Sequence, residues 1–193
     1  MKPICLLSLL LLSLLSSQAQ QGDTKFERES RVKPVEVPAS AQDFVKGCQF
    51  AQRVRWYREE SQSGLSYEAK VKSEQGRFSI EFDESGQLQD VELTQDWDQV
   101  PEKARLAIQS YLLKRFTRHR IQKIQLQWTG PEATLQALIR QEATNELYTQ
   151  KYELVIRAQD QADTQWYEML FSASGQLENA ATFRLRNTDN LDY

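Results

Sequence analysis

Two stretches, "RFSIEFDESGQLQDVE" at 77–92 and "WYEMLFSASGQLENAA" at 166–181, share the tetrapeptide Ser-Gly-Gln-Leu. Before the tetrapeptide, apolar side chains occupy every second position, which is typical of a β-strand with one buried face. Gly86 and Gly175 stand where a tight turn needs a left-handed backbone, which glycine adopts most easily. Each stretch therefore predicts a hairpin, and the shared tetrapeptide predicts one structural unit used twice.

The same alternation predicts further strands in both halves of the chain. In the first half they cover 54–60, 65–73, 76–83 and 86–94, and in the second half they lie within 121–128, 147–158, 164–173 and 175–186. Helical spacing predicts a helix within 100–116, which has Ala104, Ile108 and Leu112 at steps of four, and a weaker one over 37–52. The order of a helix followed by strands thus occurs twice.

Matching anchors divide the chain into two units. Val37-Pro38 corresponds to Val100-Pro101, which predicts a first unit over 37–99 and a second over 100–193. The second unit carries an insertion at 129–151, where Ala133, Ala137 and Leu138 predict a short extra helix. The polar, aperiodic segment 20–36 predicts a flexible leader.

The beginning of the chain has the pattern of a secretory signal peptide. Lys2 precedes a leucine-rich run that ends before the small residues Ser17 and Ala19, which predicts cleavage near Ala19 and a periplasmic or secreted protein. The apolar run is too short to span a bilayer, so no membrane insertion is expected after cleavage. A net charge of −3 argues against a nucleic-acid partner.

The stretch "GQLQDVELTQDWDQVPEKARLAIQSYLLKRFTRHRIQKIQLQW" at 86–128 resembles the periplasmic PepSY-like proteins, also called beta-lactamase-inhibitor-like. In that family a glycine-containing turn and a strand precede Val-Pro, an amphipathic helix and an isoleucine-rich strand. The likeness extends from about Val37 to Leu185 as two tandem units. It implies an α+β fold, with a two-layer α/β architecture in which helices pack on one face of an antiparallel sheet. In the inhibitor relatives, the open face of this sheet binds a partner protein.

Few residues offer catalytic or metal chemistry. Cys48 and His119 could form a nucleophile and base, but a thiol on the apolar face of a predicted helix behaves as a small hydrophobic group. The acidic stretches 83–90 and 187–193 lack the spacing of a calcium loop, and turns explain them more simply. We therefore expect a non-enzymatic protein without a metal site or cofactor.

A basic cluster follows the most regular predicted helix. It consists of Arg115, Arg118, His119 and Arg120. These residues could bind an anion or an acidic partner. The simpler interpretation is that cations gather at the carboxyl end of a helix because they complement its dipole.

Alternation also predicts which side chains face a partner. Phe78, Ile80 and Phe82 should face the helices, and Arg77, Ser79 and Glu81 the solvent. The shared turn places Tyr167, Met169 and Phe171 inward in the second unit. The predicted partner-binding residues are Trp166, Leu170, Val155, Trp56 and Tyr57, with one of the last two facing outward.

The sequence thus favours an exported binding protein that recognises a protein or cell-envelope ligand through the open face of its sheet. An inhibitor or regulator of an exported peptidase or other hydrolase is the first alternative. A structural homo-oligomer, in which the sheets of two chains pair or stack, is the second. The insertion, the leader or a second copy could also cover the apolar patch in place of a partner.

Overall fold

The computed structural model describes residues 24–25, 27–61, 64–160 and 163–183. Within these ranges the helices are α1 (Ala39–Gly47), α2 (Glu102–Arg115) and α3 (Glu132–Ile139), and two short 3-10 turns are η1 (Pro34–Glu36) and η2 (Trp97–Gln99). The strands are β1 (Thr24–Lys25), β2 (Glu27–Val32), β3 (Arg55–Ser61), β4 (Gly64–Lys72), β5 (Arg77–Asp83), β6 (Leu88–Thr94), β7 (Arg118–Thr129), β8 (Thr149–Asp160), β9 (Asp163–Ser172) and β10 (Leu177–Phe183).

All the described strands belong to one sheet. Their order is β1-β10-β9-β8-β7-β6-β5-β4-β3-β2, and neighbours from β10 to β2 run antiparallel. Only β1 is parallel to its neighbour, through Thr24 opposite Thr182 and Lys25 opposite Phe183. The antiparallel hairpins agree with the short connections that the sequence predicts.

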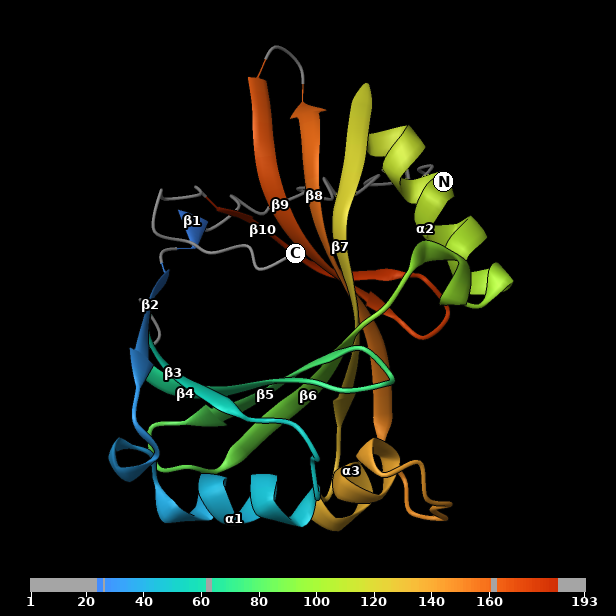
Figure 1. The fold of residues 1–193 in the computed structure, drawn as a ribbon. Coiled ribbons are helices and arrows are strands. Elements are labelled where there is room, and N and C mark those ends of the chain that lie inside the picture. The colour runs from blue at the N-terminus through green and yellow to red at the C-terminus, as the bar shows by residue number, and fades with distance from the viewer. Residues whose placement is uncertain (1–23, 26, 62–63, 161–162, 184–193) are drawn as a thin grey trace, which may run out of the picture.

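The predicted two-layer α/β architecture is wrong. The molecule is dominated by a single continuous sheet, whereas its described helices have 9, 14 and 8 residues and are too few and too short to make up a second layer of their own. Figure 1 shows α1 and α3 below the strands β3–β6 and α2 beside β7. Local periodicity identifies the helices and strands of each half separately. It does not show that backbone hydrogen bonds between β6 and β7 join the two halves into one sheet.

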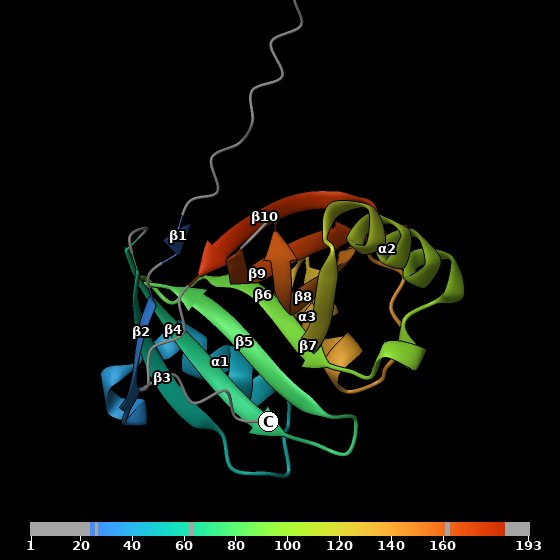
Figure 2. The ribbon, with the colours of Figure 1, turned by 90° about the horizontal axis from the view of Figure 1, so that it is seen from above.

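The sheet curls, so that its two ends approach each other (Figures 1 and 2). β1 and β2 are consecutive in the chain, yet β1 pairs with β10 at one end of the strand order and β2 with β3 at the other. The curl gives the sheet an outer face, on which the helices lie, and an inner face, which the strands surround. Right-handed strand twist accumulates over many strands and favours such curvature.

The hydrophobic core lies on the outer face in two clusters. The first contains Phe78, Ile80 and Phe82 of β5 with residues of α1 and α3, and the second contains Tyr167, Met169 and Phe171 of β9 with Ile108 and Leu112 of α2. Both sets of side chains therefore face the helices, which confirms the orientation that the alternation predicts. Leu126 packs against both clusters and links them.

The elements predicted from periodicity are confirmed, with boundaries that move by a few residues. The helix at 102–115 and the extra helix at 132–139 lie where the sequence predicts them. In α3, however, the buried residues are Thr134, Leu135 and Ile139, one step along the helix from the alanines on which the prediction relied. The buried face of α3 is therefore rotated relative to the face that the sequence pattern predicts.

The predicted flexible leader at 20–36 needs correction where it is described. Residues 27–32 form β2, which pairs with β3 along its length, and residues 34–36 form η1. A strand at the end of a sheet gains backbone hydrogen bonds without an apolar pattern, so polarity alone did not identify it. The predicted signal peptide at 1–19 lies outside the described residues, and no described helix is long and apolar enough to cross a membrane.

Candidate functional site: the inner face of the sheet

The inner face is polar and strongly acidic. Cross-strand register places Glu68 of β4 opposite Glu81 of β5, and Glu81 opposite Asp90 of β6. The same face continues through Gln125 of β7 opposite Glu153 of β8, and Glu153 opposite Leu170 of β9. Charged groups on β4–β6 and an apolar group on β9 therefore lie on the same face of the sheet.

Part of this face is shielded from solvent, contrary to the prediction that Ser79 and Glu81 face water freely. Ser79 is 7% exposed and Glu92 is 5% exposed, and Glu81 is half-buried. Curvature explains the difference, because side chains on a concave face converge and cover one another. Such buried polar groups need hydrogen-bond or charge partners, since their desolvation otherwise costs free energy.

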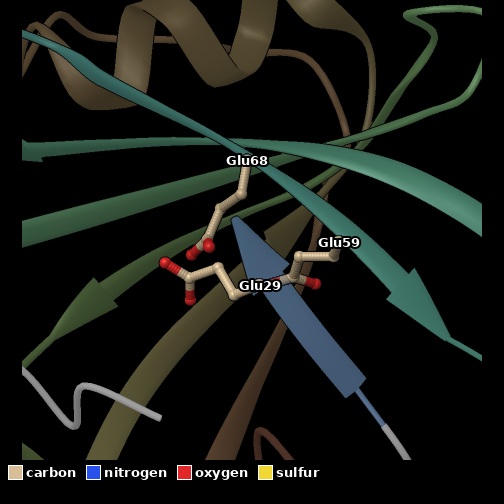
Figure 3. A group of neighbouring side chains, drawn as sticks. All are labelled: Glu29, Glu59 and Glu68. Atoms are coloured by element: carbon tan, nitrogen blue, oxygen red, sulfur yellow. The ribbon is translucent and has the colours of Figure 1, made fainter. Parts of the chain in front are cut away.

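The first acidic triad consists of Glu29, Glu59 and Glu68 on β2, β3 and β4, whose carboxylate oxygens lie within 4.8 Å of one another. Figure 3 shows the side chains of Glu29 and Glu68 extending toward each other. Lys70 Nζ lies 2.8 Å from Glu29 Oε2 and 3.0 Å from Glu68 Oε2. This triad therefore has a cation supplied by the chain itself.

Lys70 is held by several groups at once. Its Nζ lies 4.8 Å from the centroid of the Tyr57 ring, in addition to its two carboxylate partners. Burial lowers the pKa of Lys70, but the negative charges of Glu68 and Glu29 outweigh this effect and raise the pKa above its ordinary value. The ammonium group of Lys70 therefore stays charged at neutral pH. Glu68 also accepts a hydrogen bond from Ser79 Oγ.

The second acidic triad consists of Glu81, Asp90 and Glu92 on β5 and β6, again with oxygens within 4.8 Å of one another. Two neutral amides of β7 donate hydrogen bonds to it. Gln127 Nε2 lies 3.2 Å from Asp90 Oδ2, and Gln125 Nε2 donates to Glu92 Oε2. Both triads could supply oxygen ligands to a hard metal ion.

Charge accumulates at the second triad. Burial raises the pKa of Glu81 well above its ordinary value, and the carboxylates led by Asp90 and Glu68 raise it further. Burial likewise raises the pKa of Glu92, with the charges led by Glu153 and Glu81, although Lys123 acts in the opposite direction. Like charges in a shielded position disfavour ionisation, so these carboxyls bind protons more readily than carboxyls in water.

An open hollow of about 580 Å³ borders both triads. It lies at the ends of β3, β4 and β5, where Glu59, Ser66 and Glu81 contribute to its lining. Its walls contain mostly carboxylates, hydroxyls and amides, with Leu65 as an apolar contribution. The carboxylates of the hollow would interact favourably with positive charge and hydrogen-bond donors on a ligand.

The predicted partner-binding residues divide between the two faces. Trp166 and Leu170 lie on the inner face and are half-buried, and Val155 lies on the same face but is 5% exposed. Tyr57 is half-buried on the inner face, opposite Glu68. Trp56 belongs to the first core cluster, where its ring contacts Phe82, and this position removes it from a partner-binding surface.

The predicted basic patch does not form one surface. Arg118 and Arg120 alternate with His119 along β7, so the two arginines and the histidine point to opposite faces of the sheet. Arg115 ends α2, where its Nη2 forms an ion pair of 2.5 Å with Asp160 Oδ2. The position of Lys114 and Arg115 in the last turn of α2 agrees with dipole complementation.

The catalytic pair considered from the sequence is not brought together. Cys48 is buried in the first core cluster, whereas His119 lies on β7 opposite Ala158, a residue of the second cluster. Burial raises the pKa of the Cys48 thiol to about 12. A thiol with this pKa is almost entirely protonated at neutral pH and is a poor nucleophile.

The acidic stretch at 83–90 has two roles. Asp83 Oδ1 accepts hydrogen bonds from the backbone N–H of Ser85 and of Gln87, both at 2.9 Å, which agrees with the predicted turn. Asp90 instead belongs to the second triad. The other acidic stretch, at 187–193, lies outside the described residues. Sequence reasoning missed both triads because their members meet across strands and not within one loop.

Comparisons with known proteins give little further assignment. No family model matches the chain, and no curated protein matches it. Among solved structures it is similar to a DUF2874 family protein from Bacteroides ovatus ATCC 8483, with a TM-score of 0.49 and 14% sequence identity. That likeness covers 76% of this chain and 87% of the other. The resemblance to PepSY-like proteins remains a prediction.

Proposed function

We propose that the protein is an exported, non-enzymatic binding protein that recognises a protein or cell-envelope ligand through the inner face of its sheet. The observation that carries the proposal is the difference in composition between the two faces of the sheet. The outer face contains the core, whereas the inner face holds half-buried Tyr57, Trp166 and Leu170 beside charged side chains. Aromatic and apolar groups next to hydrogen-bonding groups are typical of recognition surfaces.

Two kinds of contact would contribute to binding. Trp166 and Leu170 would bury apolar surface against the ligand, because large side chains of this kind supply most of the energy in many interfaces. The carboxylates of β3–β6 would fix its orientation and favour positively charged groups, since complementary charge contributes strongly to specificity. The ligand is therefore expected to have an apolar part and a basic part.

A binding role fits the chemistry of the described residues better than catalysis. Cys48 is shielded within the core and protonated at neutral pH, and His119 lies near the other cluster. Export rests on the leucine-rich beginning of the chain and on its small residues at Ser17 and Ala19. Both expectations can be examined without knowledge of the ligand.

Recovery of partners from a cell-envelope fraction tests the proposal. The native protein and the double variant Trp166→Asp with Leu170→Asp serve as baits, and Leu106→Asp with Leu113→Asp is the matched control. The control residues are 58% and 65% exposed on α2, away from the inner face. We expect the inner-face variant to lose the partner and the control to retain it.

Equal recovery by all three baits would contradict the proposal. A partner hydrolase whose activity falls on addition of the native protein would identify the protein as an inhibitor. A stable dimer by light scattering, unchanged in the inner-face variant, would favour a structural homo-oligomer and contradict recognition through this face.

A further inference from the structure

Two arginines at the beginning of β7 join a third arginine across the inner face of the sheet. Cross-strand register places Arg120 of β7 opposite Arg157 of β8, and Arg157 opposite Trp166 of β9. Arg118 comes two residues before Arg120 and points to the same side, because side chains alternate along a strand. Arg118, Arg120 and Arg157 together form the arginine cluster.

The arginine cluster lies on the side of the sheet that the described helices leave uncovered. Arg157 stands between Ile156 and Ala158, two members of the second core cluster, so its side chain points away from that core. α2 packs on the opposite side of the same part of the sheet, through Ile108 and Leu112 (Figure 1). All three arginines of the cluster are exposed. A partner can therefore reach them without displacing a helix.

The charge of the arginine cluster is not balanced within the part of the chain that the structure describes. Its guanidinium groups make no hydrogen bond or ion pair there, whereas Arg115 pairs with Asp160. Like charges directly opposite each other on neighbouring strands are destabilising, and Arg120 and Arg157 are such a pair. Glu168 lies on the same face of β9, but one carboxylate does not balance three guanidinium groups. The cluster therefore keeps a net positive charge.

The composition and the spacing of the cluster suit several carboxylates. Each guanidinium group offers a planar fork of N–H donors that matches the two oxygens of a carboxylate. Directly opposite side chains lie about 5 Å apart, and side chains two residues apart on one strand lie roughly 7 Å apart. Trp166 adds apolar surface next to Arg157. Arginine and tryptophan are enriched among the residues that dominate the energy of protein interfaces.

We propose that the arginine cluster and Trp166 bind an acidic segment of a partner protein that also carries apolar side chains. Carboxylates of the segment pair with the three guanidinium groups, and an apolar side chain packs against Trp166. This inference rests on the proposed function, because it assigns the chemistry of one part of that partner. The acidic triads lie on β2–β6 of the same face, so complementary charge orients the partner with its acidic part toward β7–β9.

Fluorescence anisotropy with a labelled synthetic peptide in which Glu-Glu alternates with Leu tests the site on the native protein. We expect saturable binding that weakens as sodium chloride is raised, because salt screens exposed charges. A peptide with Gln in place of each Glu should not bind. Arg120→Gln with Arg157→Gln should weaken binding at least about fivefold, the effect of losing two exposed ion pairs.

Lys103→Gln with Lys114→Gln is the matched control. Both lysines are exposed on α2, and the control removes the same charge as the arginine variant. It should change the affinity for the acidic peptide by less than about twofold, because screening limits the effect of distant exposed charges. The arginine variant removes a repulsive pair and should not lower the thermal unfolding midpoint, so weaker binding cannot be ascribed to unfolding.

Several results would overturn the inference. They are no binding of the acidic peptide by the native protein, equal binding of the Gln peptide, and equal loss of affinity in the lysine control. Binding that appears only after removal of residues 187–193 would make this chain's own acidic stretch the occupant. A dimer of the native protein that the arginine variant breaks, measured by light scattering, would make a second copy the occupant.

The failure of this inference can be distinguished from the failure of the proposed function. As a bait for the cell-envelope fraction, Arg120→Gln with Arg157→Gln should lose the partner that the native protein recovers. If it retains a partner that Trp166→Asp with Leu170→Asp loses, the proposed function stands and the acidic segment is overturned. If all baits recover the same proteins, the proposed function fails, and the peptide titration still decides whether the cluster binds acidic segments.

Discussion

Gly175 shows how one residue fixes the contact between a hairpin and a helix. Its φ is +83°, and a Cβ built there would lie 2.4 Å from the carbonyl oxygen of Ala104 in α2. Gly86 has a φ of +82° in the matching turn, where a Cβ would lie 2.5 Å from Pro38 Cβ. The shared tetrapeptide therefore marks two turns that each press against the beginning of a helix.

We predict that Gly175→Ala lowers the free energy of unfolding by about 2 kcal/mol or more, because it combines backbone strain with a steric clash. Gly64→Ala is the control, since Gly64 has a φ of +130° but a Cβ there would meet no atom within 4 Å. Urea unfolding of both variants measures the difference. A smaller loss for Gly175→Ala than for Gly64→Ala would show that the hairpin does not press on α2.

The second triad makes stability depend on pH in an unusual direction. Because the folded-state pKa values of Glu81 and Glu92 are raised, the folded protein binds more protons than the unfolded chain above the ordinary carboxyl range. Stability from these groups is present at and below their unfolded pKa, and it is lost as pH rises toward their folded pKa. Asp83 and Asp160, whose pKa values are lowered, act in the opposite sense on the acid side.

We predict that Glu92→Gln stabilises the protein at mildly alkaline pH, by about 0.5–2 kcal/mol. The physical reason is the loss of one of several shielded like charges. Unfolding free energies measured from the carboxyl range upward should fall for the native protein and fall less for the variant. Parallel curves for the two proteins would mean that Glu92 is ionised without penalty.

For single residues, the sequence predicted the face of the sheet on which a side chain lies better than it predicted how deeply that side chain is buried. Alternation placed Phe78, Ile80 and Phe82 in the core because side-chain direction in a strand is a local property. It could not predict that Ser79 and Glu92 are buried on the other face, since their burial depends on the curvature of distant strands. The acidic triads were missed for the same reason.

At the scale of elements, α3 connects the two halves of the chain. It follows β7, yet its Leu135 and Ile139 belong to the core cluster of α1 and β3–β6. Gln136 Nε2 donates to the carbonyl oxygen of Phe44 at 2.9 Å, and Arg140 Nη1 donates to that of Gly47 at 2.7 Å. The insertion at 129–151 thus caps the carboxyl end of α1 and completes its core.

We predict that Leu135→Ala lowers the free energy of unfolding by about 2–5 kcal/mol, the usual cost of a cavity at a fully buried leucine. Leu113→Ala on α2, at a residue that is 65% exposed, should change it by less than about 0.5 kcal/mol. Denaturant unfolding measures both. A loss below about 1 kcal/mol for Leu135→Ala would indicate that α3 is dispensable to the core.

Elements were predictable where their own residues carry the signal. α2 has Ala104, Ile108 and Leu112 on its buried face, so its spacing identified it. β2 has no such pattern, because its hydrogen bonds to β3 hold it in place. The sequence also did not show which elements α3 packs against, because helix spacing indicates that a helix has an apolar face but not which surface covers it.

For the whole molecule, the decisive property is the continuity and curl of the sheet. Local patterns predicted antiparallel strands, but the β6–β7 pairing and the return of β1 to β10 join residues far apart in sequence. These long-range pairings turn an expected open face into an inner face. The tandem duplication remains a prediction. A helix followed by four strands occurs in each half, with α3 added between β7 and β8 in the second, and this order makes the prediction worth testing.

The central claim is that the inner face, and not the helix-bearing outer face, contacts the physiological ligand. A photo-reactive amino acid placed in turn at Tyr57, Leu170 and, as the outer-face control, Leu106 tests it directly in living cells. Crosslinked adducts from Tyr57 and Leu170, with none from Leu106, are the predicted result. Adducts from Leu106 alone would contradict the claim.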